Sequence, residues 1–254
     1  TRQEVTGIML GIGQITTRIA ELVRSAMPYA IVNNNPNQSM FSRIVSYTEV
    51  QHALDAGWLW VKVVASDVDY NEFTVSTNYT TLESNWGATF TNTNTASGQN
   101  VIEVDSDYCR LSGFHTYTAG GATGNDRRGF NIAGDYNYIN GCLVTDSDGS
   151  GFVTHGIWNS YSDCHVIDSD DYGFYTNSQG VRILGCTVNT CGNTQRFLQD
   201  SSGDNFTAVA NLALNNGTYY MASGADNGLL VGNMLDGGTD NNGSGNEITG
   251  NKTF

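Results

Sequence analysis

The chain has 254 residues, of which 30 are glycine and only 2 are proline, and its 25 acidic side chains outnumber the 11 basic ones. The resulting formal charge of −14 argues against a nucleic-acid or anionic-membrane partner, because binding phosphates requires clustered Lys and Arg. No apolar run reaches the length of a membrane-spanning helix, and the N-terminal residues lack the basic-then-apolar pattern of a signal peptide. We therefore expect no membrane insertion and no export by a signal peptide.

Residues 1–27 are predicted to form a helical stem. Apolar residues recur at alternating steps of three and four, as in a coiled-coil seam; they are Val5, Ile8, Ile12, Ile15, Ile19, Leu22 and Ala26. Isoleucine at both core positions favours three or more strands, so we expect a homotrimer. The alternative is one amphipathic helix lying on its own domain, which the glycines of the stem favour because glycine weakens an isolated helix. Pro28 is expected to end the stem, and residues 28–45 are predicted to be a linker.

A β domain with a helical cap is expected over residues 46–254. Val50 and Ala53 lie on one face of a short predicted helix that Gly57 follows, and a strand begins at Val61. A helix at this place would cover the first turn of the β domain, whose edge would otherwise present unpaired backbone groups.

From Phe130 to Val188 the sequence repeats every 22 residues. The repeat aligns Phe130, Phe152 and Phe174; Ile139, Tyr161 and Ile183; Cys142, Cys164 and Cys186; and Val144, Val166 and Val188. A period of this length, with apolar residues at alternate positions, is too short for a helical repeat and predicts one turn of a β-solenoid. Successive turns pair as strands about 4.8 Å apart, so each set is expected to stack inside the coil.

Asparagine and cysteine residues extend this pattern. Asn211 and Asn233 are also 22 residues apart, and Asn251 follows after 18. Because buried amides bond along such a stack, these residues are expected to form a ladder inside the coil. The chain has 5 cysteines, an odd number, and three share one register. We interpret them as buried thiols and predict no metal site.

A family resemblance follows from the segment before the repeat. The patterns AL-x-AG, VKVV, Y-x-E-x-TV, N-x-TTL-x-S and GATF resemble the cap and first turns of the pectate-lyase-like superfamily of right-handed parallel β-helices. The likeness is greatest to the versions found in bacteriophage tailspikes and other virion appendages. It implies an all-β, right-handed parallel β-helix, a homotrimer of side-by-side coils and an N-terminus attached to other proteins of the particle. Members of the family either cleave glycans or serve as binding or structural proteins.

Two acidic turns are the candidate catalytic or calcium-binding residues. The triplet Asp-Ser-Asp occurs twice at the 22-residue spacing, which stacks Asp146 over Asp168 and Asp148 over Asp170. Neighbouring carboxylates can act as nucleophile and acid in glycoside hydrolysis, and the same oxygens suit Ca²⁺. Asp and Ser are also preferred turn residues, because their side chains bond their own backbone. The plain-turn interpretation is favoured, and catalysis and calcium binding stay open as alternatives.

Arginine and histidine add no catalytic motif. The pattern of a catalytic arginine beside a calcium-binding acidic cluster, known from pectate lyases, has only Arg182 and Arg196 near these turns. His155 and His165 fall in adjacent turns at different positions, and no nucleophile is placed beside them. We interpret these histidines as surface residues.

Aromatic residues near turns and loops are the candidate glycan-binding residues: Tyr136, Trp158, Tyr172 and Tyr175. Such rings stack on sugar faces, and in a coil they also pack inward or at a trimer interface. The sequence leaves both roles open.

Two classes of function are consistent with these patterns. The first is a structural protein on the surface of a virion, either a trimeric host-glycan-binding spike or a capsid decoration trimer. The second is a polysaccharide depolymerase, a glycoside hydrolase or lyase that uses the aspartates on its face. A short β-helix that follows a helical stem favours the first class.

Overall fold

A computed structural model describes residues 29–33, 47–66, 68–84, 88–92, 100–118, 127–191, 196–200, 204–215, 219–221, 225–236 and 239–253. The predicted stem lies outside these residues, and so do its trimerisation residues Val5, Ile8, Ile12, Ile15, Ile19 and Leu22.

The described strands form three parallel sheets. The first sheet contains β1 (Ala30–Val32), β2 (Trp60–Val63), β5 (Thr81–Ser84), β8 (Arg110–Ser112), β11 (Tyr138–Asn140), β14 (Ser160–Ser162), β17 (Arg182–Leu184), β20 (Thr207–Val209), β23 (Leu229–Val231) and β26 (Glu247–Thr249). The second contains β3 (Tyr70–Asn71), β6 (Thr89–Thr91), β9 (His115–Tyr117), β12 (Leu143–Ser147), β15 (His165–Ser169), β18 (Thr187–Cys191), β21 (Leu212–Leu214), β24 (Met234–Leu235) and β27 (Lys252–Thr253). The third contains β4 (Phe73–Val75), β7 (Asn100–Val104), β10 (Arg128–Ile132), β13 (Phe152–Thr154), β16 (Tyr172–Thr176), β19 (Arg196–Asp200), β22 (Tyr219–Met221) and β25 (Thr239–Asn241).

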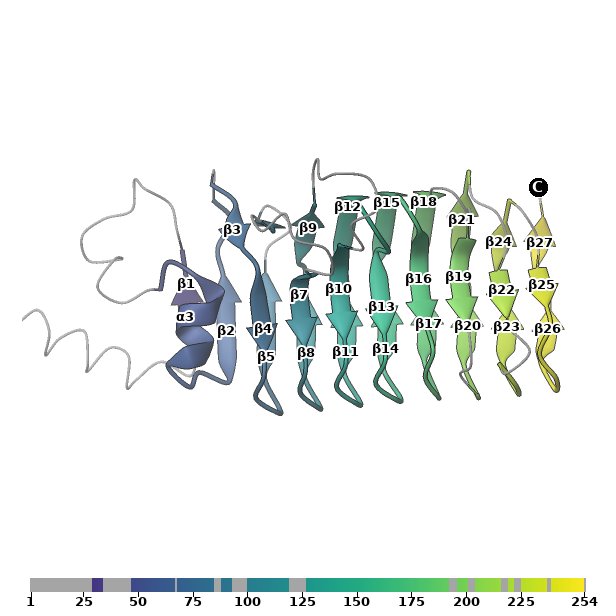
Figure 1. Cartoon of the computed structure of the whole chain (residues 1–254), viewed down its shortest axis with the longest axis horizontal. Coiled ribbons are helices and arrows are strands. Elements are labelled where there is room, and N and C mark those ends of the chain that lie inside the picture. The colour runs from purple at the N-terminus through teal and green to yellow at the C-terminus, as the bar shows by residue number, and fades with distance from the viewer. Residues whose placement is uncertain are drawn as a thin grey trace, which may run out of the picture.

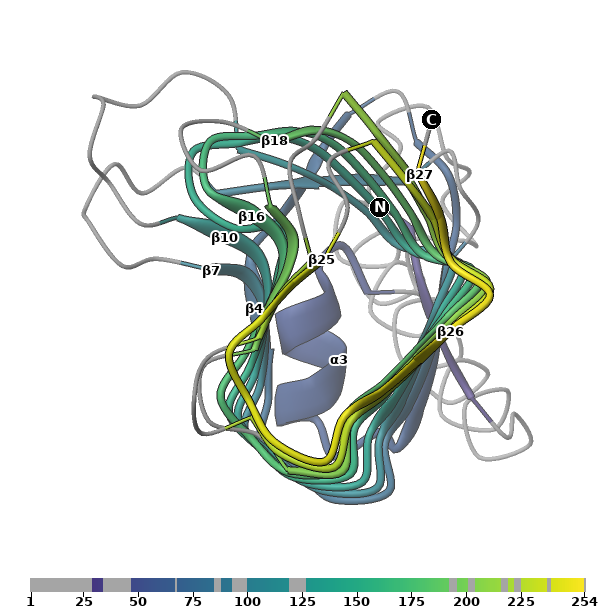
Figure 2. The ribbon, with the colours of Figure 1, turned by 90° about the vertical axis from the view of Figure 1, so that its right-hand side faces the viewer.

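From β2 onward the chain visits the first, second and third sheets in turn, so each circuit adds one strand to every sheet. Figure 1 shows the circuits side by side along one axis, and Figure 2 shows them superposed in the view along that axis. This all-β arrangement of long parallel sheets fits the predicted parallel β-helix.

The predicted rows of apolar residues are confirmed by the strand register. Phe130 pairs with Phe152 and Phe152 with Phe174, and the other aligned positions of adjacent strands pair in the same way. The three phenylalanine rings stack, with centroids 4.8 and 4.9 Å apart, and Tyr161 meets two of them edge-on. Because side chains alternate across a strand, the intervening residues face outward.

A short helix covers the N-terminal end of the coil. This helix, α3 (Val50–Asp55), buries Val50 and Ala53 against the first circuit, as predicted. It ends at Asp55 with Ala56 as its C-cap, and Gly57 follows with a φ of +83°, which is easily reached only without a side chain. β1 lies within the range predicted as linker and pairs with β2 at the start of the first sheet. In the part of the chain that is described, no helix is long and apolar enough to cross a bilayer.

Three corners connect the sheets, and at many of the described corners the backbone turns in the same way. A residue with positive φ is followed by one whose side chain points into the coil. We call the corner from third to first sheet the first corner, with Tyr79, Tyr108, Tyr136, Trp158, Gly180, Asn205, Asn227 and Gly245 at the positive-φ position. The second corner, from first to second sheet, has Gly113, Gly141, Asp163, Gly185, Ala210, Gly232 and Gly250 there. The third corner, from second to third sheet, has Asp146, Asp168, Thr190 and Asn215.

The inward residues at the corners satisfy the buried backbone of the neighbouring circuit. At the second corner, the Asn233 Oδ1 accepts hydrogen bonds from the backbone N–H and the side-chain amide of Asn211, both at 2.9 Å, and Asn251 does the same for Asn233. The predicted asparagine ladder is therefore confirmed. Cys142, Cys164 and Cys186 precede it in the same row, and all five cysteines are buried thiols, none of them in a disulfide. Burial raises the pKa of the Cys164 thiol well above its ordinary value.

Candidate functional site

The acidic triplets form the third corner. Asp146 and Asp168 occupy its positive-φ position, with φ of +47° and +56°, and the serine that follows each is buried. The serine hydroxyls bond inside the turn: Ser147 Oγ donates to the carbonyl of Ser150 at 3.1 Å, and the next serine does the same one circuit on. The middle residue of each triplet therefore anchors the turn.

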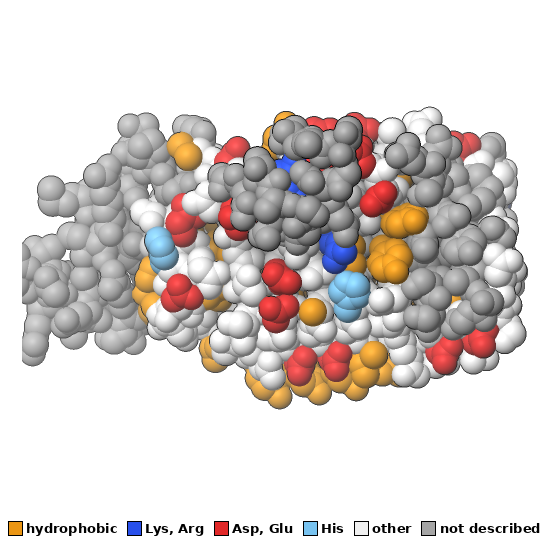
Figure 3. Space-filling view, viewed as in Figure 1, with side chains coloured by type: hydrophobic (Ala, Val, Ile, Leu, Met, Phe, Trp, Pro, Cys, Tyr) orange, Lys and Arg blue, Asp and Glu red, His pale blue; other side chains and the backbone are white. Residues whose placement is uncertain are grey.

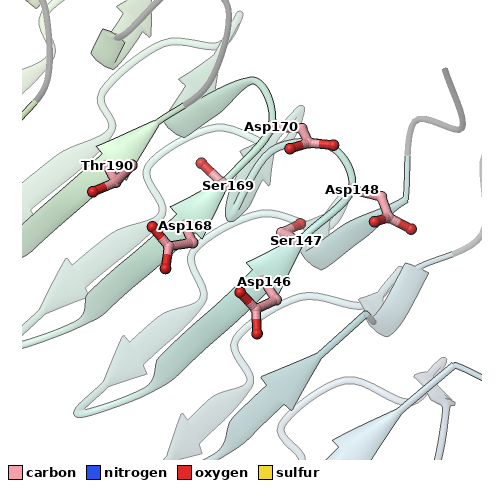
Figure 4. A pocket seen from close by; sticks show the side chains of 7 residues that line it. All are labelled: Asp146, Ser147, Asp148, Asp168, Ser169, Asp170 and Thr190. Atoms are coloured by element: carbon pink, nitrogen blue, oxygen red, sulfur yellow. The ribbon is translucent and has the colours of Figure 1, made fainter. Parts of the chain in front are cut away.

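The four carboxylates border a depression of about 210 Å³, which Figure 4 shows from close by. Asp146 and Asp168 lie side by side on neighbouring strands, with Thr190 next in their row. Asp148 and Asp170 lie beyond the two serines, further round the turn. Ser147 pairs with Ser169, which is consistent with the predicted stacking of Asp146 over Asp168 and of Asp148 over Asp170.

One of these carboxylates has a structural partner that was not predicted from the sequence. Arg127 immediately precedes β10, its side chain is 2% exposed, and its Nη2 forms an ion pair with the Asp148 carboxylate, which is 17% exposed. A buried guanidinium needs such a counter-charge. Asp148 also donates its backbone N–H to Thr118 Oγ1 at 2.9 Å. Arg182, considered from the sequence, lies on β17 in the first sheet, away from this corner.

The third corner therefore contains the features of a structural turn. Aspartate tolerates the left-handed conformation better than most side chains, which explains its choice for the positive-φ row. Within the described residues, no group of three or more His, Cys, Asp or Glu side chains has the arrangement of a metal site.

A stack of aromatic side chains follows the first corner along the coil. Tyr79, Tyr108 and Tyr136 lie with ring centroids 5.2 and 5.1 Å apart and planes within 8° of parallel. Trp158 occupies the next position of the same row. All four are partly exposed, and Figure 3 shows a row of hydrophobic side chains along the lower edge of the molecule, where the first corner lies.

This stack changes how two predicted binding residues are interpreted. The faces of Tyr108 are covered by the rings before and after it, so its edge and its hydroxyl face solvent. At the other end, the indole of Trp158 lies over Gly180, where an added Cβ would come within 2.4 Å of the ring. Tyr136 and Trp158 therefore pack along the axis, and a sugar cannot stack on a ring face that a neighbour already covers.

The other two predicted binding residues lie on the outer face of the third sheet. Tyr172 and Tyr175 of β16 stack with centroids 5.6 Å apart and border a depression of about 280 Å³. Arg128 and His155 border it from the preceding circuits, and Val153 of β13 also borders it. We call this depression the face pocket. It lies on the side of the molecule turned to the viewer in Figure 3, where basic, histidine and hydrophobic side chains lie close together.

Hydrogen bonds hold the polar side of the face pocket. His155 Nδ1 bonds Asn177 Oδ1 at 3.0 Å, and its Nε2 lies 3.4 Å from Arg128 Nη1. The same Arg128 nitrogen donates to Asn131 Oδ1 at 3.1 Å, and the amide of Asn131 donates to Glu103 at 3.1 Å. These hydrogen-bonded residues come from four neighbouring circuits, so the network forms only where the coil stacks the circuits in register.

The predicted binding residues thus fall into two places. Tyr172 and Tyr175 share the face pocket, whereas Tyr136 and Trp158 belong to the first-corner stack. His155 was predicted to be a surface residue, and Arg128 was not among the predicted site residues. The 22-residue alignment contained the relevant signal, because it places outward positions of adjacent circuits beside one another.

Comparison of the chain with protein-family models, with curated proteins and with solved structures gives no match. The parallel sheets fit a parallel β-helix, and the resemblance to the pectate-lyase-like superfamily stays a prediction from the sequence patterns.

Proposed function

We propose that this chain is a glycan-binding structural protein on the surface of a virus particle. The observation that supports glycan binding is the face pocket, where the rings of Tyr172 and Tyr175 lie beside Arg128 and His155. An aromatic surface bordered by hydrogen-bonding groups suits a sugar, whose faces are apolar and whose edges carry hydroxyls.

The position of the face pocket suits a polymer. It lies on the outside of a long sheet and draws its residues from successive circuits, so a ligand crossing it would touch several strands. Asp171 is the one carboxylate among the described residues that border it. The pair of carboxylates that glycoside hydrolysis uses is therefore not part of the proposed site.

The acidic third corner gives less support to the depolymerase alternative. Asp146 and Asp168 hold positive-φ turn positions, and Asp148 neutralises a buried arginine. The turn positions thus suit aspartate at 146 and 168, and the Asp148 carboxylate has a structural role as a counter-charge, whereas a catalytic pair needs one group placed to donate or accept a proton.

We further propose that the chain is a homotrimer attached to other virion proteins through its N-terminal region. The support is the heptad pattern of residues 1–27 and the resemblance to phage appendages. In this proposal the coil stands out from the particle as a tailspike-like or fibre-like host-binding appendage, or covers the capsid as a decoration trimer.

Light scattering of the full chain tests the trimer. We expect the mass of three chains, and a double substitution of Ile12 and Ile15 by Asp should yield smaller species, because it places charges in the seam. Thr17→Asp, a charge on the polar face of the same helix, is the matched control and should leave the trimer intact. A wild-type chain with the mass of a monomer would end the trimer proposal.

Binding to a panel of purified bacterial capsular polysaccharides and lipopolysaccharides tests the face pocket. Tyr172→Ala and Tyr175→Ala should each weaken binding to a recognised glycan about tenfold, the effect of losing about 1.4 kcal/mol of ring contact. Tyr117→Ala, which removes a partly buried tyrosine from the second sheet, is the control and should bind normally. Equal loss in all three variants, or none in any, would argue against this pocket.

A further inference from the structure

A groove of about 390 Å³ runs along the first corner, on the first-sheet side of the aromatic stack. One of its sides is the ridge of stacked rings, Tyr79, Tyr108 and Tyr136. The other side is a row of the first sheet that contains Arg110 and Tyr138, which are partners on paired strands. Because each row has one residue per circuit, the groove is parallel to the axis of the coil.

The groove offers hydrogen-bond donors. Besides the tyrosines, the described residues that border it are Thr81, Cys109 and Arg110, so none of them has a carboxylate or an amide in its side chain. The pKa of Tyr108 is raised above its ordinary value, first by partial desolvation and then by the neighbouring phenols and two nearby aspartates. Tyr108 therefore keeps its proton at neutral pH, and its hydroxyl can donate. A ligand that accepts hydrogen bonds and donates few fits this lining.

Arg110 gives the groove a positive charge. It is exposed, and its guanidinium makes no hydrogen bond or ion pair with any other residue that the structure describes. The aspartates of this corner, Asp107 and Asp135, accept backbone N–H groups of the next circuit at 2.8 Å through their Oδ1 atoms and do not border the groove. A ligand that places an acidic group on Arg110 would therefore complement the charge of the groove.

The spacing of the ridge matches one peptide conformation. Rings one circuit apart have centroids 5.2 and 5.1 Å from each other. Two circuits span about 9.6 Å, because strands of a sheet lie about 4.8 Å apart. A polyproline II helix repeats every three residues, over about 9.3 Å. A ligand residue in contact with Tyr79 is therefore followed, three residues further on, by one in contact with Tyr136.

We infer that this groove binds a proline-rich segment of another protein in the polyproline II conformation, with an acidic side chain of that segment on Arg110. Prolines suit the lining because they have a backbone carbonyl and no N–H, so they accept hydrogen bonds from the phenols and leave no donor unpaired. Their rings pack against aromatic ridges, and the preformed helix loses little conformational entropy on binding. The groove is separate from the face pocket, and either can be occupied alone.

Calorimetric titration of the full chain with a blocked proline-rich peptide that has one central glutamate tests the groove. Replacing the prolines of the peptide with glycine should weaken binding at least tenfold, because a flexible chain must be ordered on binding. Replacing its glutamate with glutamine should weaken binding about tenfold, because the charged contact with the guanidinium is lost. No binding of the parent peptide, or equal binding of the glycine version, would overturn the inference.

Variants of the protein locate the contact. Arg110→Gln should lower affinity for the glutamate peptide about tenfold and for the glutamine peptide less than twofold. Arg182→Gln is the matched control, because Arg182 is an exposed arginine in the same row of the first sheet, beyond the tyrosine stack. It removes the same charge and should change affinity for either peptide less than twofold. Equal losses in Arg110→Gln and Arg182→Gln would show an effect of net charge alone and would contradict the inference.

Two other occupants of the groove give different results with the same variants. If Arg110→Gln changes the mass of the full chain in light scattering, a second copy covers the groove. If it weakens binding of an acidic oligosaccharide as much as binding of the peptide, the groove is a sugar site. Either result would rule out the proline-rich segment. Tyr172→Ala should bind the peptide normally, so failure of the face pocket and failure of the groove are distinguishable.

Discussion

Replacing Phe152 with alanine is expected to lower the free energy of unfolding by about 4 kcal/mol. Phe152 is fully buried, stacks on Phe130 and Phe174 at 4.8 and 4.9 Å, and meets Tyr161 edge-on at 5.5 Å. A coil of this kind is stabilised by contacts between neighbouring circuits, and this ring contributes to two such contacts. Its loss leaves a cavity between circuits that the neighbouring strands cannot close without losing register.

Phe152→Leu is the graded comparison, because leucine keeps most of the apolar volume and removes the stacked ring. We expect a loss of about 1 to 2 kcal/mol, measured by denaturant unfolding of both variants beside the wild type. A loss below about 1 kcal/mol for Phe152→Ala would contradict the role of the phenylalanine row.

The second large effect is expected from Asp148→Asn, which removes the counter-charge of a buried arginine. Arg127 is 2% exposed and its ion pair is with Asp148, so the substitution leaves a charged guanidinium buried beside a neutral amide. We expect the free energy of unfolding to fall by about 3 kcal/mol. A loss of activity in this variant would therefore reflect instability of the fold and would not identify Asp148 as a catalytic acid.

Asp146→Asn and Asp168→Asn provide the control, because asparagine adopts the left-handed conformation as readily as aspartate. Their stabilities should stay within about 0.5 kcal/mol of the wild type. If they cost as much as Asp148→Asn, the acidic corner would have a role that its turn geometry does not explain. For tests of catalysis, Asp170→Asn is the appropriate substitution, since no ion pair of Asp170 is found within the described residues.

The regular part of the fold could be predicted because its signal is repeated. The rows containing Phe152, Tyr161 and Val166 recur every 22 residues, and the period alone indicates which residues pair between strands. Asn211 and Asn233 were recognisable for the same reason. A buried amide is costly unless it is bonded, so its recurrence at the period of the coil predicts a ladder.

The aromatic stack could not be found in this way, because its spacing is irregular. Tyr79, Tyr108 and Tyr136 are 29 and 28 residues apart, since the circuits between them contain longer connections. The dipeptide Asp-Tyr occurs at 107–108 and 135–136, but it also occurs at 69–70 and 171–172, which lie outside this row, so it does not identify the stack. Only the shared positive-φ position shows that Trp158 belongs to the same row as the three tyrosines.

The ion pair of Arg127 with Asp148 was missed because it depends on the path of a connection. Arg127 follows a long insertion between β9 and β10, and the sequence does not specify where the chain re-enters the coil. The face pocket was predicted only in part. Tyr172 and Tyr175 were chosen as aromatic residues near loops, whereas their partners Arg128 and His155 come from other circuits.

Sizing a purified surface polysaccharide after incubation with the full chain tests the central claim, glycan binding without cleavage, most directly. The polymer is chosen from the capsular and lipopolysaccharides that the chain binds, and its bound fraction and chain length are measured in the same sample. We predict that the polymer is bound, that its length is unchanged, and that the double substitution of Tyr172 and Tyr175 by alanine abolishes most of the binding. Shortened oligosaccharides that disappear with Asp170→Asn would contradict the account, because they would show that the chain is a depolymerase acting through its third corner.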